Sequence, residues 1–423
     1  MRSFLHLFLA FATLAAVTSK AQTLNTVGTI PSSAATTPTG LAASGTTLFV
    51  TNDNPARTLQ LYDISTPATP RLLSSTASTL VNPARRVSVS GNTAYVASYA
   101  YAPTTLTDVQ LAAFDVSNPT APVLRKTVAV NLLPPLNIVA RGEYLYVASG
   151  YFINNGYPLL IFNNNLDIVG SVGIGTGAAV NLTVNGPALY IQKGSSSTVY
   201  DLSTPTAPTL KKSTSGNVQV INGKVGYGLA SPAQGNQPNV ILTSDVSDPL
   251  NPVLMGNAEG GFGTLLGVLS SGRVLFTVGD GNFINPPSAT SLLPLRALEM
   301  SMPSVPVQIG ADLNAQGAFS LVTSGNYAYA ATLNRVNIYT VNGIITATRT
   351  KDQAALSIYP TPAHGLLTIK KAPPAASVVI YDLTGRQCLK TSLPANGTID
   401  IHSLPAGLYV ALIGDVARQL LVE

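Results

Sequence analysis

One unit recurs along most of this chain, and its recurrence limits the fold more than any other feature. Each copy begins with a glycine turn followed by an aromatic and aliphatic run, as in SGNTAYVAS around Gly91. The other copies begin at Gly45, Gly142, Gly186, Gly223, Gly272 and Gly325. A period of roughly 40 to 50 residues with several short strands per unit is typical of radial blade architectures. The spacing therefore predicts seven blades.

The second unit indicates how each copy divides into strands. Residues 85–90 alternate in polarity, 93–98 form the aromatic run, 109–116 form a second apolar run, and 122–130 follow a proline-rich corner. Alternation with a period of two is the pattern of a strand with one buried face. Each unit is therefore predicted to be a four-stranded blade.

The corner before the fourth strand recurs as DISTPATP, DVSNPTAP, DLSTPTAP and DVSDPLNP, beginning at Asp63, Asp115, Asp201 and Asp245. An Asp side chain can bond nearby backbone N–H groups, and proline fixes φ, so both residues favour a turn. A metal or catalytic role is the alternative for these aspartates. We favour the structural role, because a side chain repeated at one place in every unit serves the geometry of the repeat.

The seventh unit lacks this corner, which raises the question of how its blade is completed. Residues 24–31 resemble a fourth strand that precedes the first unit. If they complete the last blade, the ring closes and no edge is left open. Residues 344–349 are the rival closing strand, and the sequence does not decide between them.

Composition supports an all-β protein. The 423 residues include 35 glycines and 30 prolines, and only 10% are charged, which favours short strands and tight turns over helices. The formal charge of +5 is spread without long basic runs, so nucleic acid is not a predicted partner. Cys388 is the only cysteine, so no intrachain disulfide can form, and we expect it to be a small buried residue in a strand.

The N-terminus has the features of a secretory signal peptide. Arg2 precedes a mostly apolar stretch over residues 5–17, and Ser19-Lys20-Ala21 offers a small-x-small cleavage site. The mature protein is therefore predicted to begin near Gln22 and to be exported. No later apolar run is long enough to span a membrane.

The repeats contain few residue types that support catalysis. No His, Cys or Trp lies between Gln22 and Arg349, which excludes a His-based triad, a typical zinc site and an indole platform for sugars there. The runs Asn52-Asp53-Asn54 and Asp280-Gly281-Asn282 are rich in oxygen donors, but turns commonly have this composition. We therefore predict no catalytic residues, metal or cofactor, with calcium at either run as the alternative.

The segments between the second and third strands vary most, and loops at equivalent places in a ring emerge on one face. They are residues 52–57, 99–108, 150–158, 194–197, 231–238 and 279–291. The candidate binding residues in them are Tyr99, Tyr101, Tyr151, Phe152, Asn154, Asn155, Tyr157, Asn282 and Phe283. Such side chains can stack on and hydrogen-bond a glycan or a protein. Packing within their own loops is the alternative.

Two functional classes follow. The first is a non-enzymatic propeller that binds an extracellular glycan or protein. The alternative is a carboxylate- or Tyr-dependent polysaccharide-active enzyme on the same face, which would need two acids about 5 to 10 Å apart. Asp53, Asp108 and Asp280 are the acids available in the loops. Their scarcity favours binding.

The repeats resemble those of LVIVD-type β-propellers. The resemblance rests on the glycine turn, the Tyr-Val run, the Asp-Val-Ser-x-Pro corner and the following Pro-Val-Leu, and it covers roughly residues 24–345. The third and sixth copies, from Ile161 and Leu298, are degraded. The resemblance implies a propeller fold and does not define a ligand.

Residues 356–423 have a different pattern. Strands are predicted at residues 366–370, 377–382, 387–392, 397–401, 407–413 and 418–422, and they are expected to form a small antiparallel β-sandwich. The segments YPTPA, VIYDLTGR and LPAGLYV resemble the C-terminal sorting domain of type IX secretion cargo from Bacteroidetes-type bacteria. The matching residues are Tyr359, Pro360, Pro362, Gly385, Arg386, Gly407 and Tyr409. Thr361 and the ending Val422-Glu423 depart from the family pattern.

The sorting-domain resemblance implies a partner, a location and a domain layout. The partner is the type IX secretion machinery, and the location is the medium or the outer-membrane surface. The predicted layout is a signal peptide at 1–21, a propeller at 22–345, a linker at 346–355 and a sorting domain at 356–423.

Overall fold

The computed structural model describes most of the chain after the signal region. The described residues are 24–32, 36–100, 109–150, 158–175, 179, 181–193, 196–214, 218–230, 240–259, 264–268, 274–278, 295–300, 306–312, 318, 320–340, 356–360, 362–372, 375–382, 387–413 and 416–423. The predicted signal peptide and the predicted linker at 346–355 lie outside these residues, so both stay predictions.

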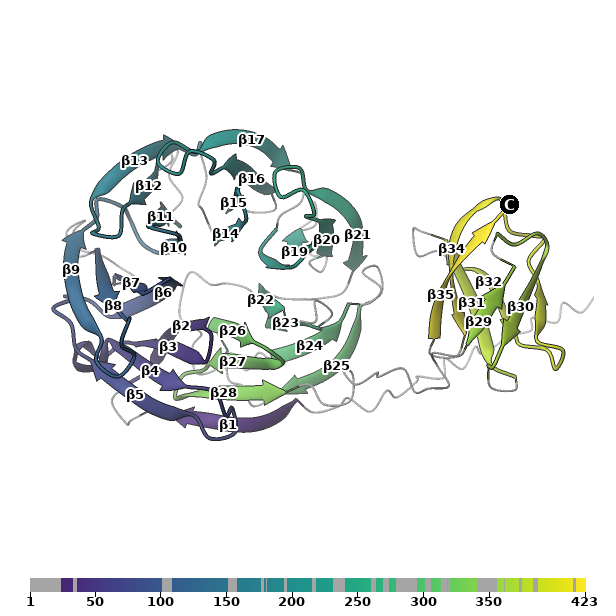
Figure 1. Ribbon diagram of the computed structural model, residues 1–423, viewed down its shortest axis with the longest axis horizontal. Coiled ribbons are helices and arrows are strands. Elements are labelled where there is room, and N and C mark those ends of the chain that lie inside the picture. The colour runs from purple at the N-terminus through teal and green to yellow at the C-terminus, as the bar shows by residue number, and fades with distance from the viewer. Residues whose placement is uncertain are drawn as a thin grey trace, which may run out of the picture.

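The described strands before residue 341 form seven four-stranded antiparallel sheets arranged radially around a centre (Figure 1). The first blade is β2 (Pro38–Ser44), β3 (Thr47–Asn52), β4 (Leu59–Asp63) and β5 (Arg71–Thr76); the second is β6 (Ala84–Ser90), β7 (Thr93–Ser98), β8 (Gln110–Asp115) and β9 (Val123–Ala129). The third is β10 (Leu136–Arg141), β11 (Tyr144–Ser149), β12 (Pro158–Phe162) and β13 (Ile168–Gly173); the fourth is β14 (Asn181–Asn185), β15 (Ala188–Lys193), β16 (Ser196–Asp201) and β17 (Thr209–Thr214). The fifth is β18 (Val220–Asn222), β19 (Val225–Ala230), β20 (Val240–Asp245) and β21 (Val253–Glu259); the sixth is β22 (Thr264–Val268), β23 (Val274–Val278), β24 (Leu295–Glu299) and β25 (Val307–Asp312). The seventh is β26 (Ser320–Ser324), β27 (Tyr327–Ala331), β28 (Arg335–Thr340) and β1 (Asn25–Pro31). The predicted all-β fold is confirmed.

Local sequence explains the shape of each blade. The first two strands are joined by glycine turns in which Gly45, Gly91, Gly142, Gly186, Gly223 and Gly325 have φ between 53° and 57°. Glycine is favoured there because it adopts positive φ without a steric penalty. The outer strand of every blade also carries a β-bulge where it pairs with the third strand, for example opposite Ala113 and Phe114. Bulges bend a strand and increase its twist, and the outer strands curve along the rim in Figure 1.

The strand that closes the ring is β1. It pairs antiparallel with β28 from Asn25 opposite Thr340 to Pro31 opposite Arg335, and it carries the same bulge as the other outer strands. Leu24 and Ile30 are buried against the sixth and first blades. Of the two segments that the sequence left open, residues 24–31 therefore complete the last blade; the rival segment 344–349 lies outside the described residues.

The core lies between neighbouring blades, and two further contacts join them there. The hydroxyls of Tyr146 and Tyr190 donate to the carbonyls of Pro205 and Pro249, which are the corner prolines of the next blade, at 3.2 and 2.5 Å. Gly28 of β1 also lies against a corner, since a β-carbon placed there would lie 2.5 Å from the Pro67 carbonyl oxygen. The corners thus hold blades together as well as turning the chain.

The C-terminal segment forms two further sheets around their own core. One contains β29 (Ser357–Tyr359), β30 (Leu366–Lys370) and β33 (Thr398–Asp400); the other contains β32 (Gln387–Ser392), β31 (Ser377–Asp382), β34 (Gly407–Ile413) and β35 (Val416–Val422). Cys388 lies in a strand, β32, as expected, but it is only half-buried and packs against the edge of this core. The sequence predicted six of these strands and missed β29, which has only three residues.

Ala363 and Val422 join the two ends of this sandwich through an isolated parallel bridge. The Ala363 N–H donates to the Leu421 carbonyl at 2.7 Å, and the Glu423 N–H donates to the Ala363 carbonyl at 3.1 Å. In the described part of the chain, no helix is long and apolar enough to cross a membrane.

Candidate binding face

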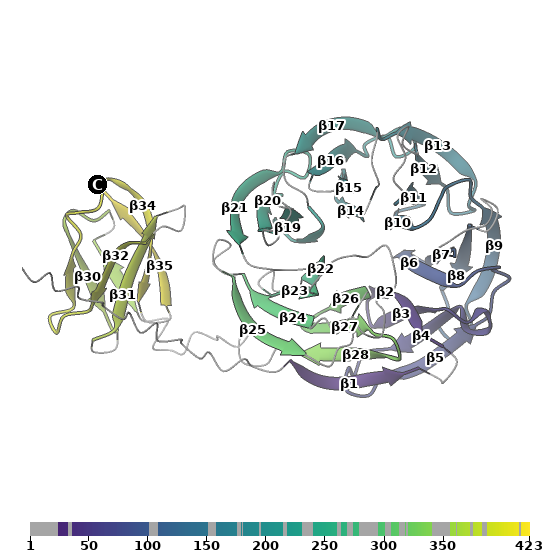
Figure 2. The same ribbon diagram turned by 180° about the vertical axis from the view of Figure 1, so that it is seen from behind.

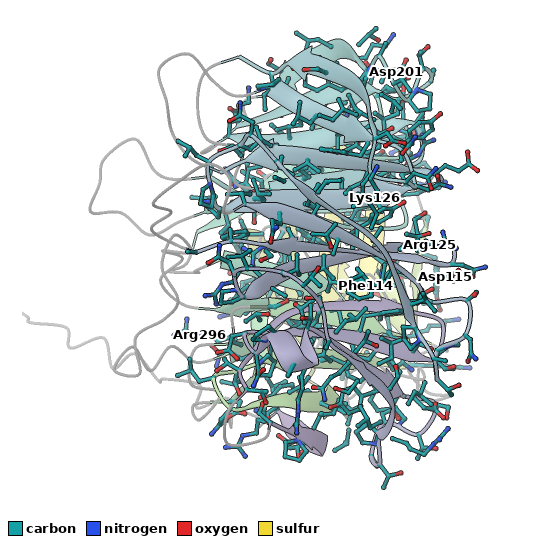
Figure 3. The ribbon with its side chains drawn as sticks, turned by 90° about the vertical axis from the view of Figure 1, so that its left-hand side faces the viewer. Phe114, Asp115, Arg125, Lys126, Asp201 and Arg296 are labelled. Atoms are coloured by element: carbon teal, nitrogen blue, oxygen red, sulfur yellow. The ribbon has the colours of Figure 1, made fainter. Side chains whose placement is uncertain are left out.

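The two faces of the propeller differ in the length of the segments that connect the strands. On one face are the glycine turns, most of them two residues long, and the corners, such as 64–70, 116–122, 202–208 and 246–252. On the other face, the segments between second and third strands range from two residues (194–195) to sixteen (279–294). We call these the corner face and the loop face. Figure 3 places Asp115, Arg125 and Asp201 toward one edge and Arg296 toward the opposite edge.

The corner aspartates are used by the corner itself. Asp63, Asp115, Asp201 and Asp245 each accept the backbone N–H of the serine two residues later, at 2.8 to 2.9 Å. Asp63 also pairs with Arg71, Asp115 with Arg125, and Asp201 with Lys211. Hydrogen bonds from Ser117, together with Arg125, lower the pKa of Asp115 to about 2. The structure therefore supports the predicted structural role of these carboxylates.

On the loop face of the first blade, the oxygen-rich run 52–54 holds a turn. The buried Asn52 side chain donates to the Arg57 carbonyl at 3.0 Å and to Gln60 Oε1 at 3.1 Å. Asp53 Oδ1 accepts the Thr37 N–H at 2.7 Å. Asn54 caps the 3-10 helix η1 (Pro55–Arg57). The Asp53 carboxylate thus fastens this segment to the connection before β2.

Tyr99 is not available as a binding residue, contrary to the prediction. Its side chain is fully buried in the core between the second and third blades. The Tyr99 N–H bonds the Pro83 carbonyl at 3.2 Å, which extends the pairing of the blade one residue beyond β7. Tyr95, Ala97 and Tyr99 consequently lie on one face and enter the same cluster. The remaining predicted binding residues, Tyr101, Tyr151, Phe152, Asn154, Asn155, Tyr157, Asn282 and Phe283, lie outside the described residues, as do Asp108 and Asp280.

Lys193 is a loop-face residue that the sequence reasoning missed. It ends β15 and is half-buried, and burial lowers the pKa of its ammonium group. The described residues place no carboxylate within ion-pair distance of it, whereas the ion pairs seen in the propeller lie on the corner side. A desolvated cation of this kind favours a negatively charged ligand group. Nothing in the sequence distinguished Lys193, because its partial burial depends on how the strand end packs.

The sorting-signal residues that the structure describes have mainly packing and turn roles. Tyr409 is buried and its hydroxyl donates to the Pro405 carbonyl at 2.7 Å. Tyr359 is partly exposed, and the Lys370 ammonium lies 5.0 Å from its ring centroid. Pro360 and Pro362 lie between β29 and β30, and Gly407 begins β34. Gly385 and Arg386 lie outside the described residues.

The two histidines of the sandwich have separate partners. His364 bonds the carbonyl of Glu423 through Nδ1 at 3.0 Å, and His402 bonds Asp400 at 2.8 Å.

Two family models match parts of the chain. Residues 83–130 match the LVIVD repeat, and residues 357–421 match the secretion system C-terminal sorting domain. Among curated proteins, no match is found.

Two solved structures resemble the chain. The WD40 β-propeller domain of Doa1 superposes with a TM-score of 0.50 and 9% identity, covering 74% of this chain and 96% of that one. The computationally designed Ika8 protein matches with a TM-score of 0.47 and 8% identity, covering 75% and 99%. At such identity the first likeness supports the fold alone.

The fold and these matches define the class of the protein as a β-propeller with a secretion tail. More particularly, it carries an LVIVD-type repeat and a C-terminal sorting domain of the type IX secretion system. The sorting domain directs it to the cell surface or the medium.

Proposed function

We propose that the propeller is a non-enzymatic binding module that uses its loop face to hold an extracellular glycan or protein. The observation that carries this proposal is the contrast between the two faces. Corner-face connections are nearly uniform and their carboxylates are used within the corners, whereas loop-face connections range from two to sixteen residues. Variation confined to one face of a repeat array is typical of a binding surface.

The chemistry of the loop face supports binding over catalysis. Asp53, the described loop acid of the first blade, is hydrogen-bonded to the backbone of its own blade. Lys193 offers a positive charge, and Tyr101, Tyr151 and Tyr157 are the proposed aromatic anchors. A surface that offers both aromatic rings and a cation suits a ligand with apolar faces and acidic groups, such as a glycan that contains uronic acid.

A glycan array with neutral and acidic members tests the proposal directly. With a bound ligand in hand, Tyr151→Ala and Tyr157→Ala should each weaken binding at least roughly tenfold, about 1.4 kcal/mol, without changing the melting temperature. Val123→Ala, on the exposed outer strand of the second blade, is the matched control and should bind normally. Intact affinity with a lower melting temperature would assign those tyrosines to loop packing.

Two further measurements separate the ligand classes. Lys193→Gln should weaken the binding of acidic ligands and leave the binding of neutral ligands unchanged, since it removes one positive charge from the loop face. Incubation with polysaccharides should release no new reducing ends or unsaturated sugars. Product formation would instead support the polysaccharide-active enzyme.

A further inference from the structure

The outer strand of the fifth blade departs from the pattern of the other blades with an aspartate corner. In the second and fourth blades, the bulged residue of the outer strand is a cation, Arg125 or Lys211, that pairs with the corner aspartate. In β21 the bulged residue is Met255. Asp245 therefore has no described cation within ion-pair distance, and Lys224 acts on it only from farther away. The fifth blade therefore lacks the cation that pairs with the corner aspartate in the second and fourth blades.

The same strand exposes a run of three apolar side chains. Val253, Leu254 and Met255 are 60%, 53% and 48% exposed, and they are consecutive. On the outer strands of the second and fourth blades, the exposed Val123 and Leu210 stand close in sequence to the pairing cation of their own blade. Contiguous apolar surface on a soluble protein commonly marks an interaction site, because covering it removes that surface from water.

A groove adjoins this run. It has a volume of about 330 Å³ and lies between β17 and the start of β21, which follow one another along the rim (Figure 2). Its lining includes Lys212 and Thr214 on one side and Pro252, Val253 and Leu254 on the other. Lys212 is exposed, and no described carboxylate lies within ion-pair distance of it. The patch therefore combines an aliphatic run with two charges that have no described ion-pair partner: Lys212 across the groove, and Asp245, which lies opposite Val253 in the pairing of β20 with β21.

We propose that this patch binds the same patch of a second copy of the chain. A two-fold interface brings each residue of the patch opposite its partner's surface, so the patch must be complementary to itself. The patch meets this requirement, because a two-fold axis beside β21 sets Lys212 of each copy against Asp245 of the other. The aliphatic side chains of the two β21 strands then cover one another. The missing cation of the fifth blade is supplied by the second copy.

The mass of the mature protein in solution tests the proposal. Sedimentation or light scattering over about 1 to 100 µM should give a mass that rises from one copy to two, since a modest interface dissociates at low concentration. A mass of one copy throughout this range would refute the dimer, and would also be the result if the patch served a different protein.

Substitutions locate the contact. Met255→Arg restores the cation found in the second and fourth blades, so the blade can pair its own Asp245 while a bulky charge enters the interface. It should weaken the dimer at least about tenfold with an unchanged or higher melting temperature. Lys212→Glu faces the partner's Asp245 with a like charge and should weaken the dimer as well. Val123→Arg, on the outer strand of the second blade, is the matched control and should dimerise normally. If Met255→Arg dimerises like the unchanged chain, or Val123→Arg fails equally, the contact is not at β21.

Discussion

The propeller and the C-terminal sandwich both form ordered β-structure without a disulfide, but they join their ends in different ways. In the propeller, β1 pairs with β28 along a whole strand, and Leu24 and Ile30 are buried in the process. In the sandwich, one parallel bridge joins Ala363 to Val422. The ring therefore depends on segments that are far apart in sequence, whereas the sandwich depends on a segment of under 70 residues. This contrast implies that the two parts can be separated experimentally.

The largest expected effect comes from removing the sandwich. Deleting residues 356–423 should stop delivery to the surface or the medium and leave the propeller in the periplasm, because the sorting domain is lost. The melting temperature of the propeller should not change, since its described hydrogen bonds and core clusters lie within residues 24–340. Fractionation followed by immunoblotting measures the first outcome, and calorimetry the second. Normal yield of the truncated protein in the medium would disprove the sorting role.

The next effect is the opening of the ring. Deleting residues 24–30 removes the outer strand of the seventh blade and exposes the edge of β28. The loss of the buried Leu24 and Ile30 side chains should lower the free energy of unfolding by about 1.5 to 3 kcal/mol for each side chain. The free edge should promote aggregation. Calorimetry and light scattering measure both consequences. Deleting 344–349 instead is the control, and an equal loss there would mean that this rival segment closes the ring.

A smaller effect is expected from one contact between blades. Tyr190→Phe removes the hydroxyl that donates to the Pro249 carbonyl, and it leaves the ring of the side chain in place. The free energy of unfolding should fall by about 0.5 to 1.5 kcal/mol, the usual net contribution of one hydrogen bond. Chemical denaturation measures it. Tyr359→Phe in the sandwich should leave propeller stability unchanged, and a similar loss in both variants would mean that the Tyr190 contact contributes nothing.

The smallest effect concerns acid stability. Asp115 has a folded pKa of about 2, below its ordinary value of 3.8, mainly because Ser117 and then Arg125 stabilise the carboxylate. A lowered pKa favours the folded state above pH 4, and this contribution is lost as the pH falls from about 4 to about 2. Asp115→Asn keeps an acceptor for Ser117 but cannot titrate. Its melting temperature should therefore fall less than that of the unchanged chain between pH 4 and pH 2, and an identical fall would show that Asp115 does not contribute.

The sequence predicted the repeats well because each blade is specified by local chemistry. Glycine at positive φ and the aspartate–proline corner mark strand ends wherever they occur. The closing strand could not be chosen, since 24–31 and 344–349 are both short segments of mixed polarity and only long-range pairing distinguishes them. Tyr99 was assigned to the loop face because it follows the predicted end of the strand, although the alternation of Tyr95, Ala97 and Tyr99 indicated the core. The role of Lys193 depends on burial, which alternation does not report.

The pairing of β1 with β28 also fixes the order of events in biosynthesis. The first strand emerges from the ribosome before any other part of the ring, but its partner follows only at residues 335–340. Bringing together such distant segments is slow, because the entropy of closing a long loop must be overcome first. The ring therefore cannot be completed until nearly all of the propeller has been synthesised. For a chain that is exported, this delay keeps the polypeptide open, and hence able to thread through a narrow translocation channel, for as long as its first strand remains unpaired.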